Sequence, residues 1–317
     1  MIKPLKIVDL FCGAGGWSQG LIKAGHEIIL SIDNWEPAVN TYKKNIGDHV
    51  IQKEITEELL DDKHIMNKIR DADIIIGSPP CKTFSPLNKN KTDDLTLTRI
   101  YFKLVGDKPF IMENVAPVYK QMKKSNLIDD NYFAKIIEMS DYGVPQVRRR
   151  FILSNFFDLN SVPKPKSSEN KSYYKGMEDY IKLFDDIPEE FKIKDTPSHQ
   201  KHIVERMKTV KNGTSWKDFG VYYRVPKTGI SYTIVNVTKS MMIHPTENRR
   251  LSVQEAAIIQ TFPPSYDFQG TVADIGNQVG NAVPPKFAEF IGHNLNDQLQ
   301  RHNSRHKQLS LDIYNNK

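Results

Sequence analysis

The chain has 317 residues, of which 39% are hydrophobic and 26% are charged, values typical of a soluble globular protein. It contains no run of about eighteen apolar residues and no recognisable secretory signal, so we expect neither a membrane span nor export, and a cytoplasmic location. The formal net charge of +6 suits a polyanionic partner, although solubility alone would also explain it.

Cysteine and histidine usage limits the covalent and metal chemistry. The two cysteines, Cys12 and Cys81, argue against a disulfide framework and fit a reducing cytosol. The nine histidines are scattered and none forms a cluster with zinc-ligand spacing. We therefore expect no metal.

Short apolar runs alternate with helical patterns through the first half of the chain. Strands are predicted over residues 5–11, 27–32, 49–51, 73–76 and 109–112. Apolar residues at helical spacing follow three of these strands and predict helices. One helix includes Leu21, the next runs from Ile55 to Ile69, and the third includes Leu104. This alternation predicts a parallel, doubly wound sheet, whose ligands lie at the carboxyl ends of the strands. The residues that fall there are Cys12, Asp33, Cys81 and Glu113.

The pattern changes after residue 151. Residues 155–245 are rich in Lys, Ser, Asn, Pro and Tyr, with strand-like runs such as 231–237, and predict a smaller second domain. Ser252 and Glu255 make a capping box that opens a helix, and another helix follows Pro285. From about Arg301 the chain is polar and is expected to fray. The expected divisions are 1–165, 166–265 and a segment 266–317 that returns to the first domain.

A glycine-rich turn, Phe11-Cys12-Gly13-Ala14-Gly15-Gly16, joins the first predicted strand to a helix. Such a turn lets the backbone approach a ligand closely. Asp33 ends the next strand, where an acid can bind ribose hydroxyls. The pair would serve NAD, a flavin or S-adenosylmethionine, and a purely structural turn is also possible. No second phosphate-binding feature is present, which favours a nucleoside over a dinucleotide.

Two further motifs follow the fourth and fifth predicted strands. In Ser78-Pro79-Pro80-Cys81 the prolines stiffen a turn that presents a thiol, whose thiolate is the reactive form. Most free cysteines are small buried hydrophobes, but Cys81 leads a polar loop. Glu113 can act as an acid or a base near a cysteine, while a strand-end carboxylate without chemistry is the simpler interpretation.

Arginines and Gly-Asn pairs mark the last two motifs. Arg148 and Arg150 share one face of a predicted strand and can hold phosphate or base edges, or else form a solvated basic strand. The sequence GNQVGNAVPP at 276–285 contains two Gly-Asn pairs, which predict tight turns. Asn281 there can bind a ligand or only shape a loop.

The order of these motifs, GAGG, PPC, ENV, QxRxR and GNAVPP, resembles the DNA cytosine-5 methyltransferase family over nearly all of 5–155 and 244–292. The resemblance implies a Rossmann-like, S-adenosylmethionine-dependent methyltransferase domain of the α/β class, with a smaller target-recognition domain inserted. It implies that Cys81 attacks C6 of a flipped cytosine in double-stranded DNA. Glu113 would stabilise N3, and Arg150 with Arg148 would orient the base near O2.

The resemblance also assigns binding residues. Those implied for S-adenosylmethionine are Phe11, Gly13, Ala14, Gly15, Gly16, Asp33, Asn34, Glu54, Ile55, Ser78, Pro80, Asn281 and Ala282. Those implied for DNA are Lys82, Ser85, Lys89 and Arg249. Candidates for reading the target sequence, among which phosphate contacts and core residues are expected, are Lys175, Lys217, Arg224, Lys239, Tyr173, Tyr174, Trp216, Tyr222 and Tyr223.

The chain departs from the family pattern at three points. Lys82 replaces the usual glutamine, the loop from Lys82 to Asp94 lacks glycine, and Asp33 replaces the more usual glutamate. Because of the first two differences, the resemblance does not determine how that loop closes or which of its residues contact DNA. A shorter acid at Asp33 keeps the capacity to bind ribose.

The compact size favours a prokaryotic or phage modification enzyme that protects DNA from a partner restriction endonuclease. Three alternatives stay open. One is the same chemistry on tRNA, and another is a catalytically silent DNA-binding homologue, against which the intact set of Cys81, Glu113, Arg148 and Arg150 argues. The third, an NAD-dependent enzyme, accounts only for the glycine turn and Asp33.

Overall fold

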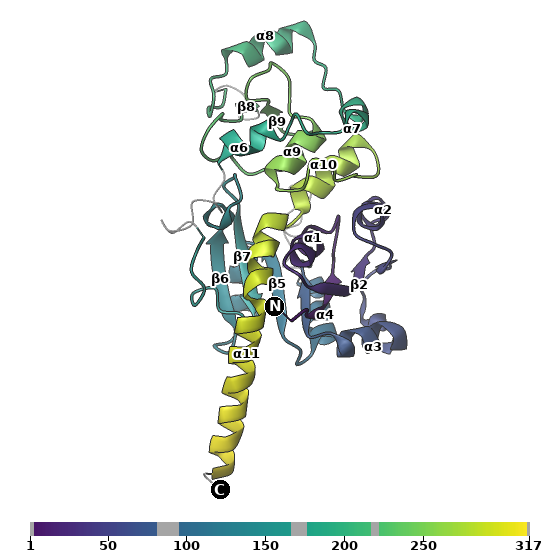
Figure 1. Cartoon of the computed structure of the whole chain (residues 1–317), viewed down its shortest axis with the longest axis vertical. Helices are drawn as coiled ribbons and strands as arrows, with labels where there is room; N and C mark the ends of the chain where they lie inside the picture. Colours follow the sequence, from purple (N-terminus) through teal and green to yellow (C-terminus); the bar gives the residue numbers. More distant parts are fainter. Residues whose placement is uncertain (1–2, 81–94, 166–175, 217–221, 316–317) are drawn as a thin grey trace.

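The computed structural model describes residues 3–80, 95–165, 176–216 and 222–315. A seven-stranded sheet lies at its centre, in the order β3-β2-β1-β4-β5-β7-β6 (Figure 1). The strands are β1 (Lys6–Leu10), β2 (Glu27–Asp33), β3 (Val50–Gln52), β4 (Ile74–Gly77), β5 (Phe110–Val115), β6 (Phe133–Glu138) and β7 (Arg149–Ser154). The first five are parallel, and β7 runs antiparallel to both β5 and β6. The predicted α/β class and its five parallel strands are therefore confirmed.

Helices cover both faces of the sheet. They are α1 (Gly16–Lys23), α2 (Glu36–Asn45), η1 (Glu57–Asp61), α3 (Lys63–Asp71), α4 (Thr96–Val105), α5 (Val118–Lys124) and η3 (Met139–Tyr142). The single helix expected from Ile55 to Ile69 is wrong, because the chain forms η1 and then α3. The Asp62 carboxylate accepts the backbone N–H groups of His64 and Ile65 and so starts a new helix.

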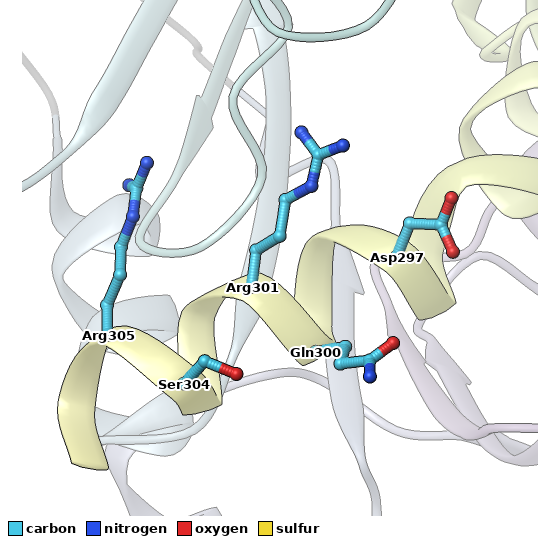
Figure 2. Close-up of a pocket in the computed structure, with 5 residues that line it drawn as sticks. All are labelled: Asp297, Gln300, Arg301, Ser304 and Arg305. Atoms are coloured by element: carbon cyan, nitrogen blue, oxygen red, sulfur yellow. The ribbon is translucent and has the colours of Figure 1, made fainter. Parts of the chain in front are cut away.

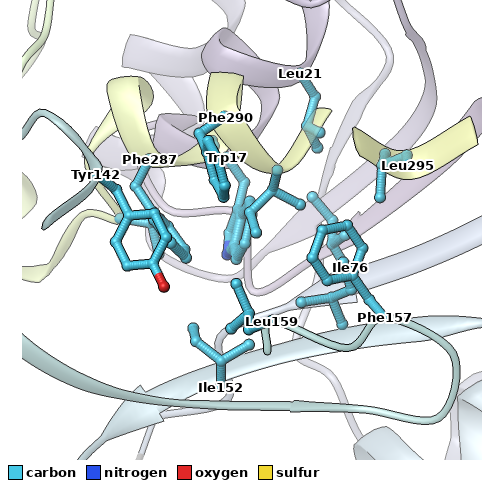
Figure 3. Packing of buried hydrophobic residues seen from close by; sticks show 14 of the residues in the cluster. Trp17, Leu21, Ile76, Tyr142, Ile152, Phe157, Leu159, Phe287, Phe290 and Leu295 are labelled. Atoms are coloured by element: carbon cyan, nitrogen blue, oxygen red, sulfur yellow. The ribbon is translucent and has the colours of Figure 1, made fainter. Parts of the chain in front are cut away.

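Alternate residues along each strand divide the core into two layers. Ile7, Ile76 and Ile152 pack under α1 and α11 with Trp17 and Phe287, as Figure 3 shows for most of them. Their neighbours in sequence, including Val8, Ile75 and Phe151, pack under α3 and α4 on the opposite face. Because side chains of a strand alternate between faces, continuous apolar runs are needed to fill both layers.

A second group of elements lies beyond one end of the sheet (Figure 1). It contains α6 (Met177–Lys182), α7 (Glu189–Lys194), α8 (Lys201–Thr209), β8 (Tyr222–Arg224), β9 (Met241–Ile243), α9 (Val253–Ile259) and α10 (Val272–Asn281). These elements have a hydrophobic cluster of their own, from Met177 to Val279, into which Ala14 of the glycine turn also packs. The capping box of Ser252 and Glu255 is confirmed.

Two local predictions in this region are wrong. Residues 231–237 form no strand, since their extended chain is joined to its neighbour by one bridge, Gln146 to Ser231. The Gly-Asn pairs at 276–277 and 280–281 lie within α10 rather than in tight turns. A second capping box, Thr271 with Asp274, starts that helix and outweighs the low helix propensity of glycine.

The last helix, α11 (Pro285–Asn315), returns to the sheet and packs against α1. The two helices can come this close because Gly20 has no Cβ. A Cβ there would lie 2.3 Å from the Pro285 carbonyl oxygen. The expectation of a frayed end is wrong, since α11 stays helical through Asn315 and projects past the sheet (Figure 1). Within the described ranges, no helix combines the length and the apolar character needed to cross a membrane.

Candidate active site and cofactor-binding edge

Glu113 and Arg150 form an ion pair where β5 and β7 lie side by side. In the antiparallel register Val115 is opposite Arg150 and Glu113 is opposite Ile152, so Glu113 and Arg150 are diagonal neighbours on one face. Arg150 Nε lies 3.0 Å from Glu113 Oε1, and the two side chains are 15% and 7% exposed. The structure thus brings together two of the predicted catalytic residues, as a largely desolvated carboxylate–guanidinium pair.

The turn that leads to Cys81 is tied to three neighbouring elements. Asn114 Nδ2 donates to the Pro79 carbonyl at 2.8 Å, which joins the turn to β5 beside Glu113. Trp17 Nε1 of α1 donates to Ser78 Oγ at 3.1 Å, and the Ser78 N–H donates to Leu10 of β1 at 3.3 Å. Cys81 lies just outside the described residues, so its predicted role remains a prediction. Asn114 was missed in the sequence, although its place in the ENV motif is the signal that marks it.

The glycine turn and Asp33 meet as the sequence predicts. Asp33 accepts the Gly13 N–H at 2.8 Å on one carboxylate oxygen and the Trp35 N–H at 2.9 Å on the other. Burial raises the pKa of Asp33, and these N–H groups oppose the rise. Gly13 has a φ of +53°, and a Cβ built on it would meet no atom within 4 Å. The turn therefore borders open space at the carboxyl ends of β1 and β2.

Ala14, Gly15 and Gly16 face the protein instead. The Ala14 carbonyl accepts a 2.6 Å hydrogen bond from the Tyr266 hydroxyl. A Cβ on Gly16 would lie 2.1 Å from the Val283 carbonyl oxygen, so this glycine lets the chain after α10 approach the turn. These residues shape the site through packing.

The remaining residues implied for the cofactor stand around the same edge. Phe11 lies beside the turn with a φ of +58°, and Ile55 is buried three residues beyond the end of β3 at Gln52. Side chains that are at least partly open to solvent belong to Asn34, Glu54, Ser78, Pro80, Asn281 and Ala282. A partly open rim around a buried apolar residue suits a nucleoside ligand.

Three predicted arginines are held by contacts within the protein. The Arg148 guanidinium donates to the carbonyls of Ile234, Gly280 and Ala282 and does not contact Glu113. Arg249 is paired with Glu247 and Glu255. Arg224 is buried and donates five hydrogen bonds, four of them to backbone carbonyls, so it belongs to the core rather than to a base-reading surface.

Several other predictions fall outside the described residues. They concern Lys82, Ser85, Lys89, Tyr173, Tyr174, Lys175 and Lys217. Of the remaining base-reading candidates, Lys239 is exposed, Tyr222 is partly buried, and Tyr223 packs in the cluster of the second group of elements. Trp216 lies against Tyr222, with 5.8 Å between ring centroids.

A buried polar network beneath the glycine turn was not foreseen. The Ser18 hydroxyl donates to Asp9 Oδ2 at 2.6 Å, and the Tyr42 hydroxyl donates to Ser18 at 2.9 Å. Tyr42 also accepts from Ser31 at 2.7 Å and lies 3.0 Å from His49 Nε2. Burial, with a smaller contribution from nearby Asp33, raises the pKa of Asp9 to about 7. The signal in the sequence is an acid inside the apolar run IVDLF.

The described part of the structure contains no cluster of metal ligands. No group of three His, Cys, Asp or Glu side chains could hold a metal ion there. A surface hollow of about 450 Å³ lies along α11 and is lined by Asp297, Gln300, Arg301, Ser304 and Arg305 (Figure 2). All five come from one face of a single helix, away from the strand ends.

Curated relatives of similar length carry methyltransferase names. The chain is 31% identical to the type II methyltransferase M.HindV of Haemophilus influenzae, over 90% of this chain and 95% of that protein. It is 30% identical to the type II methyltransferase M1.HphI of Haemophilus parahaemolyticus, over 90% of this chain and 85% of the relative.

Solved structures share the fold. A structure described as a DNA modification methyltransferase encoded within a prophage (E. coli) superposes with a TM-score of 0.72 at 24% identity, covering 93% of this chain and 99% of the other. The S. pombe Dnmt2 methyltransferase gives a TM-score of 0.64 at 17% identity, covering 94% of this chain and 99% of the other. The model of the C-5 cytosine-specific DNA methylases matches residues 5–297, and the chain therefore belongs to that family.

Proposed function

We propose that this protein transfers a methyl group from S-adenosylmethionine to C5 of a cytosine in double-stranded DNA, with Cys81 as the nucleophile. The observation that supports this most directly is the buried Glu113–Arg150 pair, with Asn114 fastening the turn before Cys81 to the same strand. An acid and a cation at strand ends, beside a turn that leads into a cysteine, suit this reaction, which needs an acid, a cation and a thiol.

The cofactor edge fits S-adenosylmethionine. Asp33 would bind the ribose hydroxyls, open space at Gly13 would allow close approach, and Ile55 would supply apolar surface for an adenine ring. The two carboxylate oxygens of Asp33 keep lone pairs beyond those used by Gly13 and Trp35. When bound, the cofactor supplies an electrophilic methyl group on a sulfonium.

The chain's own residues carry the rest of the reaction. The Cys81 thiolate adds to C6 of the base and forms a C–S bond, which makes C5 an enamine-like nucleophile. Negative charge moves toward N3, which Glu113 stabilises when it is protonated or shares a proton with the ring, while Arg150 orients the base near O2. After C5 has gained the methyl group, transfer of the C5 proton to a water molecule restores the C5–C6 double bond and expels the Cys81 thiolate.

Duplex DNA is the proposed substrate, and the target base must leave the stack, at a cost of a few kcal/mol. The net charge of +6 favours binding to phosphates. Residues 166–265 would form a target-recognition domain, and segment 266–317 would complete the catalytic domain. The type II names of the relatives support a role in a restriction-modification system with a partner endonuclease.

Bisulfite sequencing of plasmid DNA from cells that express the wild type or Cys81→Ala tests this proposal. Protected cytosines within one short motif, found only with the wild type, would support it and reveal the recognition sequence. The variant should still fold and bind DNA, because its phosphate contacts remain. If folded wild type that binds S-adenosylmethionine protects no cytosine, duplex DNA is not its substrate. Methyl incorporation into tRNA then separates an RNA methyltransferase from a silent homologue.

A further inference from the structure

A closed ring of hydrogen bonds lies between the sheet and the second group of elements. Gln146 Oε1 accepts the Ile234 N–H at 2.8 Å, and Gln146 Nε2 donates to Gln260 Oε1 at 2.6 Å. Gln260 Nε2 donates to the Ala282 carbonyl at 2.7 Å, which also accepts from Arg148 at 2.9 Å. Arg148 closes the ring by donating to the Ile234 carbonyl at 3.1 Å.

The ring is sealed from water. Gln146, Arg148 and Gln260 are between 0% and 1% exposed. Arg148 has no ion-pair partner among the described residues, and the charged groups that act on it are Arg150 and Glu113. A buried cation held only by carbonyl dipoles is costly, and losing one partner leaves the others without water. The ring is therefore expected to hold or break as a unit.

Four segments that are distant in sequence meet in this ring. They are the lead into β7, the extended chain around Ile234, the end of α9 and the end of α10. Arg148 lies two residues before Arg150, which pairs with Glu113. The ring therefore connects the catalytic pair to segments of the second group of elements.

Three exposed apolar side chains, here called the patch, lie on the segments that meet in the ring: Val147, Tyr232 and Val235 are 41%, 56% and 47% exposed. The Val147 N–H donates to the Ser231 carbonyl at 2.8 Å, and Thr233 Oγ1 donates to the Val147 carbonyl. The patch is continuous along the chain with exposed Arg149 and with Arg150. Apolar side chains beside exposed arginine suit the sugars and phosphates of duplex DNA next to the target base.

We propose that Gln146, Arg148 and Gln260 are positioning residues that couple DNA bound at this patch to the geometry of Glu113 and Arg150. This inference rests on the proposed function. Contact of DNA with the patch moves or stiffens residues 231–235. Because the backbone N–H and C=O of Ile234 are both hydrogen-bonded in the ring, this change in position or mobility reaches Gln146 and Arg148, just before β7. Gly280 lets the backbone at Val235 pack closely against α10, since a Cβ there would lie 2.9 Å from the Val235 carbonyl carbon.

The test compares Arg148→Lys with Arg224→Lys. Both replace a buried arginine that donates to backbone carbonyls, but Arg224 bonds only within the second group of elements. Methyl transfer to a duplex containing the site found by bisulfite sequencing gives kcat and KM. Calorimetry with S-adenosylhomocysteine and the Tm report cofactor binding and stability. Gln260→Met, which keeps length and removes both amide hydrogen bonds, repeats the test at an uncharged member of the ring.

We expect Arg148→Lys and Gln260→Met to lower kcat by about tenfold to a hundredfold, with little change in KM for DNA. Preference for the recognised site over other cytosines should fall with kcat. Arg224→Lys should lower the Tm while kcat per folded molecule stays near the wild-type value. An active wild type whose ring variants lose only stability would overturn the coupling and leave the proposed function intact. An inactive wild type would overturn both.

Discussion

Replacing Asp9 with asparagine should make the protein more stable at neutral and alkaline pH. Asp9 is fully buried in β1, and its Oδ1 atom has no hydrogen-bond partner within the described residues. Asparagine keeps the oxygen that accepts from Ser18 and cannot ionise. Its amide nitrogen would occupy the site of the unpartnered Oδ1, so asparagine imitates the protonated form of the wild type.

The magnitude follows from the pKa of Asp9, which burial and nearby Asp33 raise from 3.8 to about 7. Between these values the folded protein binds more protons than the unfolded chain, so wild-type stability falls as pH rises. The rise in pKa corresponds to roughly 4 kcal/mol, all of which is lost above about pH 7. The Asp9→Asn variant has no carboxyl group at this position and so loses none of this stability as pH rises. The stability difference should therefore widen by about 1.4 kcal/mol per pH unit between roughly pH 5 and 7 and then level off.

Equilibrium urea unfolding of both proteins from about pH 5 to 8.5 measures this difference, since other titrating groups are shared and cancel. Asp71→Asn is the control: Asp71 is exposed, and its hydrogen bond with Lys6 lowers the pKa of Asp71, so its titration lies below this range. The control should give no widening. Parallel stability curves for the wild type and Asp9→Asn would refute the reasoning and mean that Asp9 is ionised in the folded protein.

Two further changes test the site. Glu113→Gln should slow methyl transfer by about a hundredfold or more while S-adenosylhomocysteine binds as before, because the amide keeps the shape but not the acid; collapse of cofactor affinity in calorimetry would contradict this role. Gly16→Ala should lower the free energy of unfolding by about 1–3 kcal/mol, since its Cβ would lie 2.1 Å from the Val283 carbonyl oxygen. Urea unfolding measures this cost, and an unchanged midpoint would show that the chain at Val283 moves aside freely.

The five parallel strands were predictable because each is a short apolar run ended by turn residues, and both layers of a doubly wound sheet demand such runs. Their ends differ from prediction by only a few residues, the largest difference being β5, which continues to Val115. The contact of Asp33 with Gly13 followed from the same logic, since carboxyl ends of neighbouring parallel strands meet at one edge. These features depend on local patterns, and local patterns are readable in sequence.

Other features depend on partners that are distant along the chain. A Gly-Asn pair predicts a turn in isolation, yet Gly276 and Gly280 lie in α10, where they admit Asn236 and Val235 at close range. Packing against those residues requires the missing Cβ, and it offsets the poor helix propensity of glycine. The frayed C-terminus was mispredicted because polar composition describes solvation, whereas α11 continues a helix already begun against α1.

The sequence by itself determined the α/β class, the order of the motifs and the identity of the candidate acid, nucleophile and ribose-binding groups. Only the tertiary structure decided which cation serves which purpose. Arg148, Arg150 and Arg249 are alike in sequence, but only Arg150 pairs with Glu113, because β7 adds antiparallel beside β5. Arg148 binds carbonyls of two distant segments, and Arg249 is neutralised by Glu247 and Glu255. A charged side chain takes its role from the acceptors that folding brings within reach, and those acceptors come from parts of the chain that no local pattern connects.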